Sequence, residues 1–147
     1  MQNINELIAR HKVVPVIKLN RVEDALPLAE ALVEGGLPVA EITFRTAAAP
    51  ESIAKVAAQY PDMLVGAGTV TNVTQAQQAL DAGARFVVTP GVSRAVTEFC
   101  LKKNLPLFAG ACTPSEVMAL MEYGLDVAKF FPCAQFGGLA TIKARAG

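Results

Sequence analysis

The sequence predicts an α/β protein in which six βα units form one parallel sheet. Short apolar, β-branched segments alternate with helical patterns at a repeat of roughly 20–25 residues. These apolar segments are continuous rather than alternating with polar residues, which is typical of strands buried on both faces of a parallel sheet. Right-handed βα connections then pack the helices against the sheet.

Each element is predicted from this pattern in chain order. A short amphipathic helix over residues 4–10 precedes the first strand. The six strands are expected at residues 13–19, 39–44, 64–67, 86–89, 107–109 and 127–131. The helices that follow them are expected at residues 22–34, 50–60, 74–82, 94–103, 114–123 and 139–146.

Proline and glycine mark the ends of these helices. Pro27 must lie in the first turn of its helix, or that helix begins late or kinks, whereas Pro50 suits a helix start. The segment Thr113-Pro114-Ser115-Glu116 has the spacing of a capping box, with proline at the first helical position. Glycines follow three helices where a left-handed residue is expected, at Gly35, Gly83 and Gly124.

Two architectures fit such units: a doubly wound open sheet and a (β/α)8 barrel of the TIM type. The dinucleotide-binding form of the doubly wound sheet has a glycine-rich turn after its first strand, whereas residues 19–22 contain no glycine. The polar and reactive side chains instead follow the carboxyl ends of successive strands, where barrel enzymes carry their sites. We therefore expect a barrel of this family, incomplete because six units cannot close eight strands.

Composition limits the classes of protein that fit. The 147 residues suit one domain, over residues 1–147, and 52% are hydrophobic, which is enough for a sizeable core. Thirteen basic residues balance thirteen acidic ones, so the charge does not indicate a nucleic-acid partner. No apolar run approaches the roughly 18 residues of a membrane span, and the polar N-terminus does not resemble a signal peptide. We expect no membrane association and a cytoplasmic protein.

Cysteine and histidine are too few for the common metal and nucleophile sites. The three cysteines, Cys100, Cys112 and Cys133, lack CxxC spacing, which argues against a disulfide framework and against a zinc site. His11 is the single histidine and is interpreted as a surface or cap residue. We expect free thiols, no metal and no cofactor.

Lys129 is the most informative residue for chemistry. It lies within the apolar segment 126–132, which is predicted to be a buried strand. Burial disfavours the charged form of a lysine, lowers the pKa of the amine and makes it nucleophilic near neutral pH. That chemistry suits an enzyme that forms a Schiff base. The alternative is a lysine that reaches a strand end or pairs with a carboxylate.

Charged residues also follow the second strand. Alternation along a strand places Glu41, Thr43 and Arg45 on the same side. Inside a barrel, a buried glutamate beside an amine can transfer protons, and an arginine can hold a carboxylate through two parallel hydrogen bonds. The alternative is a structural ion pair between Glu41 and either Arg45 or Lys129.

The next strand ends add weaker signals. In the segment 66–70 the glycines allow a ligand to approach the backbone and Thr69 offers a hydroxyl group, although Gly-x-Gly-Thr is also an ordinary turn. Pro90 follows the fourth strand and can form the wall of a pocket. Taken together, four such strand ends without a metal-ligand cluster indicate metal-independent imine chemistry on a small keto acid.

A family resemblance supports this interpretation. Six motifs occur in this order: Val14-Pro15-Val16-Ile17, Glu41-Ile42-Thr43-Phe44-Arg45-Thr46, Gly66-Ala67-Gly68-Thr69-Val70, Val88-Thr89-Pro90-Gly91, Thr113-Pro114-Ser115-Glu116 and Lys129-Phe130-Phe131-Pro132. With them the chain resembles, over essentially all of its length, the 2-keto-3-deoxy-6-phosphogluconate / 4-hydroxy-2-oxoglutarate aldolase family. The resemblance implies a class I aldolase on a barrel of roughly 200 residues, usually a homotrimer.

The resemblance also implies the site residues. It places the Schiff-base lysine at Lys129 and the acid/base glutamate at Glu41. Four further residues are implied to bind substrate, the first two as carboxylate contacts and the others as apolar walls: Arg45, Thr69, Pro90 and Phe131. The implied substrates are keto acids that are cleaved to pyruvate and either glyceraldehyde 3-phosphate or glyoxylate.

Two departures from the family pattern lead to further expectations. Cys133 and Ala134 stand where the family usually has Ala-Glu, so a carboxylate near the site is missing. The chain stops at Gly147, before two βα units that carry the family's phosphate-binding loop. We therefore expect either an engineered or truncated fragment, or a chain whose barrel is completed by another copy or a partner. The alternative functions are a non-catalytic scaffold or assembly component, and a different phosphate-binding barrel enzyme.

Overall fold

The computed structural model describes residues 4–145, whose six parallel strands form one sheet in the order β1-β2-β3-β4-β5-β6. Each strand pairs with its neighbour in the chain, so the strand order has no reversal. A doubly wound sheet requires such a reversal, so the barrel prediction is confirmed and the doubly wound alternative is excluded. The strands are Val16–Ile17 (β1), Val39–Thr43 (β2), Leu64–Gly68 (β3), Val87–Val88 (β4), Leu107–Ala111 (β5) and Ala128–Phe130 (β6).

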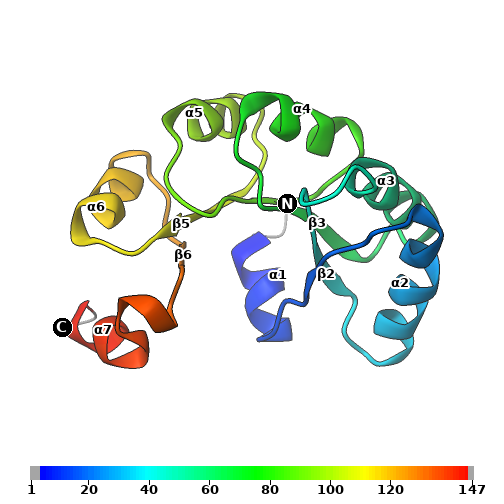
Figure 1. The fold of residues 1–147 in the computed structure, drawn as a ribbon, viewed down its shortest axis with the longest axis horizontal. Helices are drawn as coiled ribbons and strands as arrows, with labels where there is room; N and C mark the ends of the chain where they lie inside the picture. The colour runs from blue at the N-terminus through cyan, green and yellow to red at the C-terminus, as the bar shows by residue number, and fades with distance from the viewer. Residues whose placement is uncertain (1–3, 146–147) are drawn as a thin grey trace.

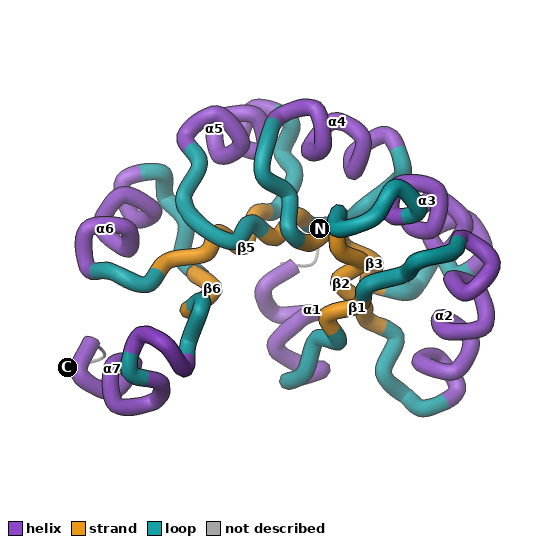
Figure 2. The backbone as a smooth tube through the Cα atoms, viewed as in Figure 1, coloured by secondary structure: helices purple, strands orange, loops and turns teal. Residues whose placement is uncertain are grey.

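The helices lie on both sides of the curved sheet. They are Ile4–His11 (α1), Ala25–Glu34 (α2), Ala49–Gln59 (α3), Val73–Asp81 (α4), Arg94–Lys102 (α5), Pro114–Glu122 (α6) and Gly138–Arg145 (α7), with 3-10 helices at Val22–Asp24 (η1) and Ala134–Phe136 (η2). Figure 1 shows α2 to α6 along the outer side of the sheet and α1 on its inner side. Figure 2 shows the strands as the inner line of this arc. None of the described helices is long and apolar enough to cross a membrane.

Most predicted boundaries agree with the structure to within two residues, and the main exceptions are a shorter β1 and a divided second helix. The predicted helix 22–34 consists of η1 followed by α2, so Pro27 lies in the first turn of α2. A proline ring collides with the carbonyl group four residues earlier, here that of Glu23, so the α-helix does not extend further back. The predicted end of the last helix at Ala146 lies outside the described residues.

The capping box predicted at the start of α6 is confirmed. The Thr113 side chain accepts a hydrogen bond from the backbone N–H of Glu116. In return, the Glu116 carboxylate accepts hydrogen bonds from the backbone N–H groups of Cys112 and Thr113, at 2.9 and 2.8 Å. These hydrogen bonds, of which the one from Cys112 contributes most, lower the pKa of Glu116 to about 2.

Glycines end the helices as predicted at two positions out of three. Gly83 and Gly124 have a left-handed backbone, with φ of +83° and +74°. After α2 the prediction was wrong by one residue, because Gly35 has φ −73° and Gly36 takes the left-handed conformation. A C-cap residue stands between the last helical residue and the left-handed position, and Gly35 occupies it.

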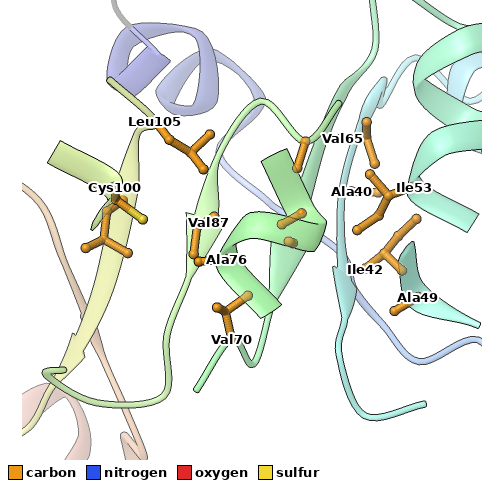
Figure 3. Close-up of a cluster of buried hydrophobic side chains, with 14 of the residues drawn as sticks. Ala40, Ile42, Ala49, Ile53, Val65, Val70, Ala76, Val87, Cys100 and Leu105 are labelled. Atoms are coloured by element: carbon orange, nitrogen blue, oxygen red, sulfur yellow. The ribbon is translucent and has the colours of Figure 1, made fainter. Parts of the chain in front are cut away.

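The larger core lies between the sheet and its outer helices. Figure 3 shows part of this cluster, in which Ala40 and Ile42 of β2 lie beside Ile53 of α3. Val65 and Ala67 of β3 belong to the same cluster. These strand residues occur at every second position, so the residues between them lie on the inner side of the sheet.

A smaller cluster fills the inner side of the sheet near the amino ends of the strands. Its buried members are four residues in or next to strands, and six partly buried residues pack against them, three of them from α1: Val39, Leu64, Phe86 and Val88, with Ile4, Leu7, Ile8, Val14, Leu37 and Phe108. The first helix therefore covers one end of the inner side with hydrocarbon, and the polar side chains lie toward the other end.

The strands in the middle of the sheet are buried on both faces, as predicted, whereas the outermost strands are not. Every residue of β2, β3 and β4 is buried. In β1, Val16 is 55% exposed, and in β6, Ala128 is exposed. Each of these two strands pairs with a single neighbour among the described residues, which leaves one edge of each strand uncovered.

Gly66 provides the space that the ring of Phe86 occupies. A Cβ atom at position 66 would lie 2.2 to 2.4 Å from three carbon atoms of that ring. Phe86 is 1% exposed and packs edge to face against Phe108, with the ring centroids 5.7 Å apart. The missing side chain of one residue on β3 therefore allows two aromatic rings to pack inside the sheet.

We predict that Gly66→Ala lowers the free energy of unfolding by about 1–3 kcal/mol, because the Phe86 ring must give up part of its packing to admit the added methyl group. Gly91→Ala is the matched control, since a Cβ atom at that position meets no atom within 4 Å. Urea denaturation followed by circular dichroism measures both variants. Equal unfolding free energies for the two variants would contradict the packing argument.

Candidate active site

Strands β2 and β6 bring together an amine and a carboxyl group that are far apart in the sequence. Lys129 is the middle residue of β6 and is in register with Gly110 of β5. Its Nζ atom lies 3.5 Å from Oε1 of Glu41, a residue 88 positions earlier on β2. The same Nζ lies 5.1 Å from the centroid of the Phe131 ring. The ion pair that the sequence left as an alternative is therefore present.

Lys129 is less buried than its apolar neighbours in the sequence predict. Its side chain is 29% exposed, whereas that of Glu41 is 5% exposed. The expectation of a fully buried strand around Lys129 was wrong. Val127, which precedes β6, is 40% exposed, because β6 has one neighbouring strand among the described residues. The glutamate, rather than the lysine, is the deeply buried member of the pair.

The side chain of Glu41 lies across β3 at Gly68. A Cβ atom at position 68 would lie 2.1 Å from Oε1 and 2.5 Å from Cγ of Glu41. The interpretation that the glycines of this segment admit a ligand is therefore wrong at Gly68, because Glu41 fills that space. Sequence reasoning missed this contact, and the two glycines at alternate positions of β3 were its only signal.

Burial raises the pKa of Glu41 above its ordinary value of 4.5 and is the largest of four influences. The charge of Lys129, the hydrogen bond to Lys129 and the charge of Arg45 act in the opposite direction. The loss of hydration therefore outweighs the attraction of two cations. A carboxyl group in this state holds and releases a proton at a higher pH than an ordinary glutamate.

A cavity of about 260 Å³ adjoins the pair. Its lining contains these two polar residues and eight apolar ones: Ile8, Val14, Val16, Phe86, Val88, Phe108, Val127 and Ala128. This apolar lining and the 5% exposure of the Glu41 side chain explain why burial dominates the pKa of Glu41. The contribution of Ile8 was not predicted, because no local pattern in the first helix indicates that it lies near β2 and β6.

Arg45 does not line this cavity. Strand β2 ends at Thr43, whose Oγ1 donates a hydrogen bond to the carbonyl oxygen of Ile17 at 2.9 Å. Arg45 follows in the turn, is exposed, and lines a second cavity of about 430 Å³ together with Gln75 and Gln78. The predicted alternation of side chains therefore does not extend to Arg45, because the strand ends two residues before it.

Thr69 and Pro90 follow β3 and β4, also outside the lining of the cavity. Thr69 is half-buried and has φ +56°, a conformation that a β-branched residue rarely adopts. Backbone strain of this kind concentrates at functional sites. Pro90 is exposed, and its carbonyl oxygen packs so closely against Gly110 that a Cβ atom there would lie 2.3 Å away. Phe131 is 37% exposed.

The remaining candidates for metal or thiol chemistry do not converge on this site. Among residues 4–145, no group of three or more His, Cys, Asp and Glu side chains could hold a metal ion. Cys100 is buried, and burial raises the pKa of its thiol to about 11. The Cys112 thiol donates a hydrogen bond to Glu116 at 3.4 Å. The arrangement therefore supports chemistry of an amine assisted by a carboxyl group.

Comparison with known proteins gives a consistent result. The family model described as KDPG and KHG aldolase matches residues 4–147; KDPG is 2-keto-3-deoxy-6-phosphogluconate and KHG is 4-hydroxy-2-oxoglutarate. A 2-dehydro-3-deoxy-phosphogluconate aldolase of Treponema pallidum is 47% identical over 146 residues, which are 99% of this chain and 70% of that protein. A KHG/KDPG aldolase of Escherichia coli K12 is 42% identical over 135 residues, 92% of this chain and 63% of that protein.

A solved structure of a relative is also similar to this chain, in both fold and sequence. It is the crystal structure of KDPG aldolase from Legionella pneumophila with pyruvate captured at low pH as a covalent carbinolamine intermediate. It matches with a TM-score of 0.88 and 42% identity, over 91% of this chain and 65% of that chain. The chain therefore spans about two thirds of the length of the relatives it matches.

The raised pKa of Glu41 predicts how stability depends on pH. The folded protein holds the Glu41 proton more tightly than the unfolded chain, so this group stabilises the fold below pH 4.5 and loses that contribution as pH rises through the folded-state pKa. Glu41→Gln cannot ionise at this position. We therefore predict that the unfolding free energy of the natural chain falls relative to that of Glu41→Gln as pH rises from about 4 to about 8.

Urea denaturation at several pH values measures this difference. Glu51→Gln is the matched control, because it removes an exposed carboxylate that pairs with Lys55 on α3. A difference between the natural chain and Glu41→Gln that is independent of pH, or that grows in favour of the natural chain, would contradict the raised pKa.

Proposed function

We propose that this chain, which belongs to the KDPG and KHG aldolase family, is a class I aldolase that cleaves these keto acids through a Schiff base on Lys129. The observation that carries the proposal is an amine 3.5 Å from a buried carboxyl group with a raised pKa. An amine can form the imine and an adjacent acid/base group can move the protons. KDPG would yield pyruvate and glyceraldehyde 3-phosphate, and KHG would yield pyruvate and glyoxylate.

The Legionella relative supports this proposal. That protein holds pyruvate as a covalent carbinolamine, the species that forms when an amine adds to a ketone. This chain is 42% identical to it over 91% of its own length. We assign the equivalent bond here to Lys129, because its amine lies beside both an acid/base group and a cavity.

In the first part of the proposed reaction, the neutral amine of Lys129 attacks C2 of the keto acid. The ketone oxygen takes up a proton, which gives the carbinolamine. Loss of water then gives a protonated imine. Glu41 exchanges these protons with the bound substrate, directly or through a water molecule, and its raised pKa allows it to remain a proton donor at a higher pH than an ordinary glutamate.

In the second part, Glu41 removes the proton of the C4 hydroxyl group. The C3–C4 bond breaks, its electron pair passes toward the imine nitrogen to give an enamine, and C4 leaves as the aldehyde. Protonation of the enamine at C3 restores the imine. Hydrolysis then releases pyruvate and returns the amine of Lys129.

Four residues are proposed to hold the substrate. Arg45 and Thr69 bind the carboxylate of the keto acid, and the guanidinium can do so through two parallel hydrogen bonds. The charge of Arg45 acts on the pKa of Glu41, which supports a position near the reacting groups. Pro90 and Phe131 are proposed as apolar walls, and the Phe131 ring lies 5.1 Å from the amine.

Keto acids are the small-molecule partners that this proposal requires. We further propose that the protein acts in the cytoplasm as a homo-oligomer, with the trimer that the family resemblance implies. Two large apolar side chains of α6 support a contact between subunits, because Met118 is 62% and Met121 is 68% exposed.

We predict that borohydride reduction in the presence of pyruvate attaches one pyruvyl group to Lys129. Intact mass spectrometry detects the adduct and peptide mapping locates it. Lys129→Ala removes the adduct, whereas Lys55→Ala, which replaces an exposed lysine on α3, retains it. If folded protein gives no adduct at millimolar pyruvate, the imine proposal fails and the non-catalytic scaffold becomes the better interpretation.

We predict that Glu41→Gln lowers kcat/KM for KHG cleavage about 10²–10⁴-fold, because acid–base catalysis is lost. Gly68→Ala lowers it about 10²-fold, because the new Cβ atom displaces the Glu41 carboxylate. Since the second change acts through the first residue, the double variant should be no slower than Glu41→Gln alone. An enzyme-coupled assay of released pyruvate measures all three variants. Losses that multiply in the double variant would show that Gly68 acts by another route.

A further inference from the structure

The turn after β2 is attached to the chain segments on both of its sides. Before Arg45, the backbone N–H of Phe44 donates a hydrogen bond to the carbonyl oxygen of Gly68, the last residue of β3, at 2.7 Å. After Arg45, Thr46 Oγ1 donates a hydrogen bond to the carbonyl oxygen of Leu19, two residues past β1, at 2.5 Å. Arg45 therefore lies between two neighbours that are each attached to another segment of the sheet.

The partner of the Thr46 hydroxyl is itself held in place. Leu19 is 6% exposed, and its side chain belongs to the larger core. Two residues earlier, the carbonyl oxygen of Ile17 accepts a hydrogen bond from the hydroxyl of Thr43 at 2.9 Å. The paired positions of β1 and β2 end at Ile17 and Ile42. The Thr46 hydroxyl therefore continues the contact between these two segments beyond the last paired residues.

The side chain of Arg45 is not held by a salt bridge. It is exposed, and no carboxylate among residues 4–145 lies within salt-bridge distance of it. The charge of Arg45 nevertheless acts to lower the pKa of Glu41. A long guanidinium side chain has many conformations, so the position of its backbone limits the points that it can reach. The attachment of the turn therefore decides where the guanidinium can act.

We propose that Thr46 is a positioning residue for Arg45, whose guanidinium it keeps within reach of Glu41 and of the carboxylate of the bound keto acid. This inference rests on the aldolase function proposed above, in which Arg45 holds that carboxylate. Thr46 itself touches no reacting atom. Its hydroxyl fixes the turn, and a fixed turn reduces the conformational freedom that Arg45 loses when the keto acid binds.

The pKa of Glu41 reports the position of Arg45 independently of turnover. Two charged groups among the described residues act on Glu41, Lys129 of β6 and Arg45, whereas α1 and the β1 segment contribute apolar side chains beside it. Thr46→Val removes the hydroxyl donor and should raise the pKa of Glu41, as Arg45→Gln should, because both changes take a positive charge away from the carboxyl group. An NMR titration of protein labelled with ¹³C at the glutamate Cδ measures this pKa, and Glu41→Gln identifies the Glu41 signal by its absence.

Steady-state cleavage of KHG measures the effect on the reaction. We expect Thr46→Val to lower kcat/KM about tenfold, mainly through a higher KM, because a poorly positioned guanidinium binds the carboxylate less well. Thr46→Ser keeps the hydroxyl and should retain both the pKa of Glu41 and the kcat/KM of the natural chain. When Arg45 is already replaced by glutamine, Thr46→Val should change neither value further, since it acts through Arg45.

A stability control separates positioning from folding. Thr113→Val removes the hydroxyl that caps α6, so it destabilises the chain without removing a hydrogen bond from the turn of Arg45. It should leave the pKa of Glu41 and kcat/KM unchanged. Thr46→Ala removes the same hydroxyl as Thr46→Val without adding a methyl group, and it takes the place of the valine variant if that variant does not fold.

The outcomes distinguish this inference from the proposed function. An unchanged pKa of Glu41 in Thr46→Val or in Arg45→Gln, a loss of kcat/KM that Thr46→Ser shares, or losses that multiply in the double variant overturn the inference. A reducible pyruvate adduct on Lys129 in the same samples leaves the aldolase proposal intact. Conversely, a pKa of Glu41 that rises in both variants, without a pyruvate adduct on the natural chain, supports the positioning of Arg45 beside Glu41 and overturns the aldolase proposal.

Discussion

The contact between Lys129 and Glu41 is the interaction on which the rest of the site depends. It connects β2 with β6, across 88 positions of sequence, and so couples the chemistry to the curvature of the whole sheet. The side chain of Glu41 is almost completely buried, whereas that of Lys129 remains partly exposed to solvent. A buried pair of this kind gains little net stability, because desolvation offsets most of the attraction. The approach of the two groups is therefore better explained by chemistry than by stability.

Glycines on β3 and β5 make this arrangement possible. Gly66 admits the ring of Phe86, and Gly68 admits the carboxylate of Glu41, so two alternate positions of β3 set the inner surface of the site. Gly110, in register with Lys129, admits the carbonyl group of Pro90 in the same way. These glycines leave spaces of fixed shape, and each space is filled by one residue that lies on or next to another strand.

The difference between local and long-range contacts explains what the sequence could predict. Some features depend on residues only a few positions apart, and the sequence pattern predicts them. They are the order of elements, the capping box at Thr113 and the position of Pro27 in the first turn of its helix. The approach of Glu41 to Lys129 was expected from strand ends and from family resemblance. The filling of Gly68 depends on a side chain 27 positions away, and the position of Arg45 depends on where β2 stops. The periodicity of a single sequence does not specify which side chain contacts a given glycine, and it does not specify the residue at which a strand ends.

The apolar cavity links the energetic cost of the site to its reactivity. Apolar side chains from α1, from the β1 segment and from the strands around Glu41 keep water from its carboxyl group. This burial raises the pKa of Glu41 although the charges of Lys129 and Arg45 act to lower it. A fully solvated glutamate would stabilise the fold more at neutral pH, but it would surrender its proton at a lower pH. The same hydrocarbon gives the Lys129 amine an apolar neighbourhood on one side. Reduced stability at neutral pH and a proton that can be exchanged at a higher pH are therefore consequences of one feature, the burial of the Glu41 carboxyl group among apolar side chains.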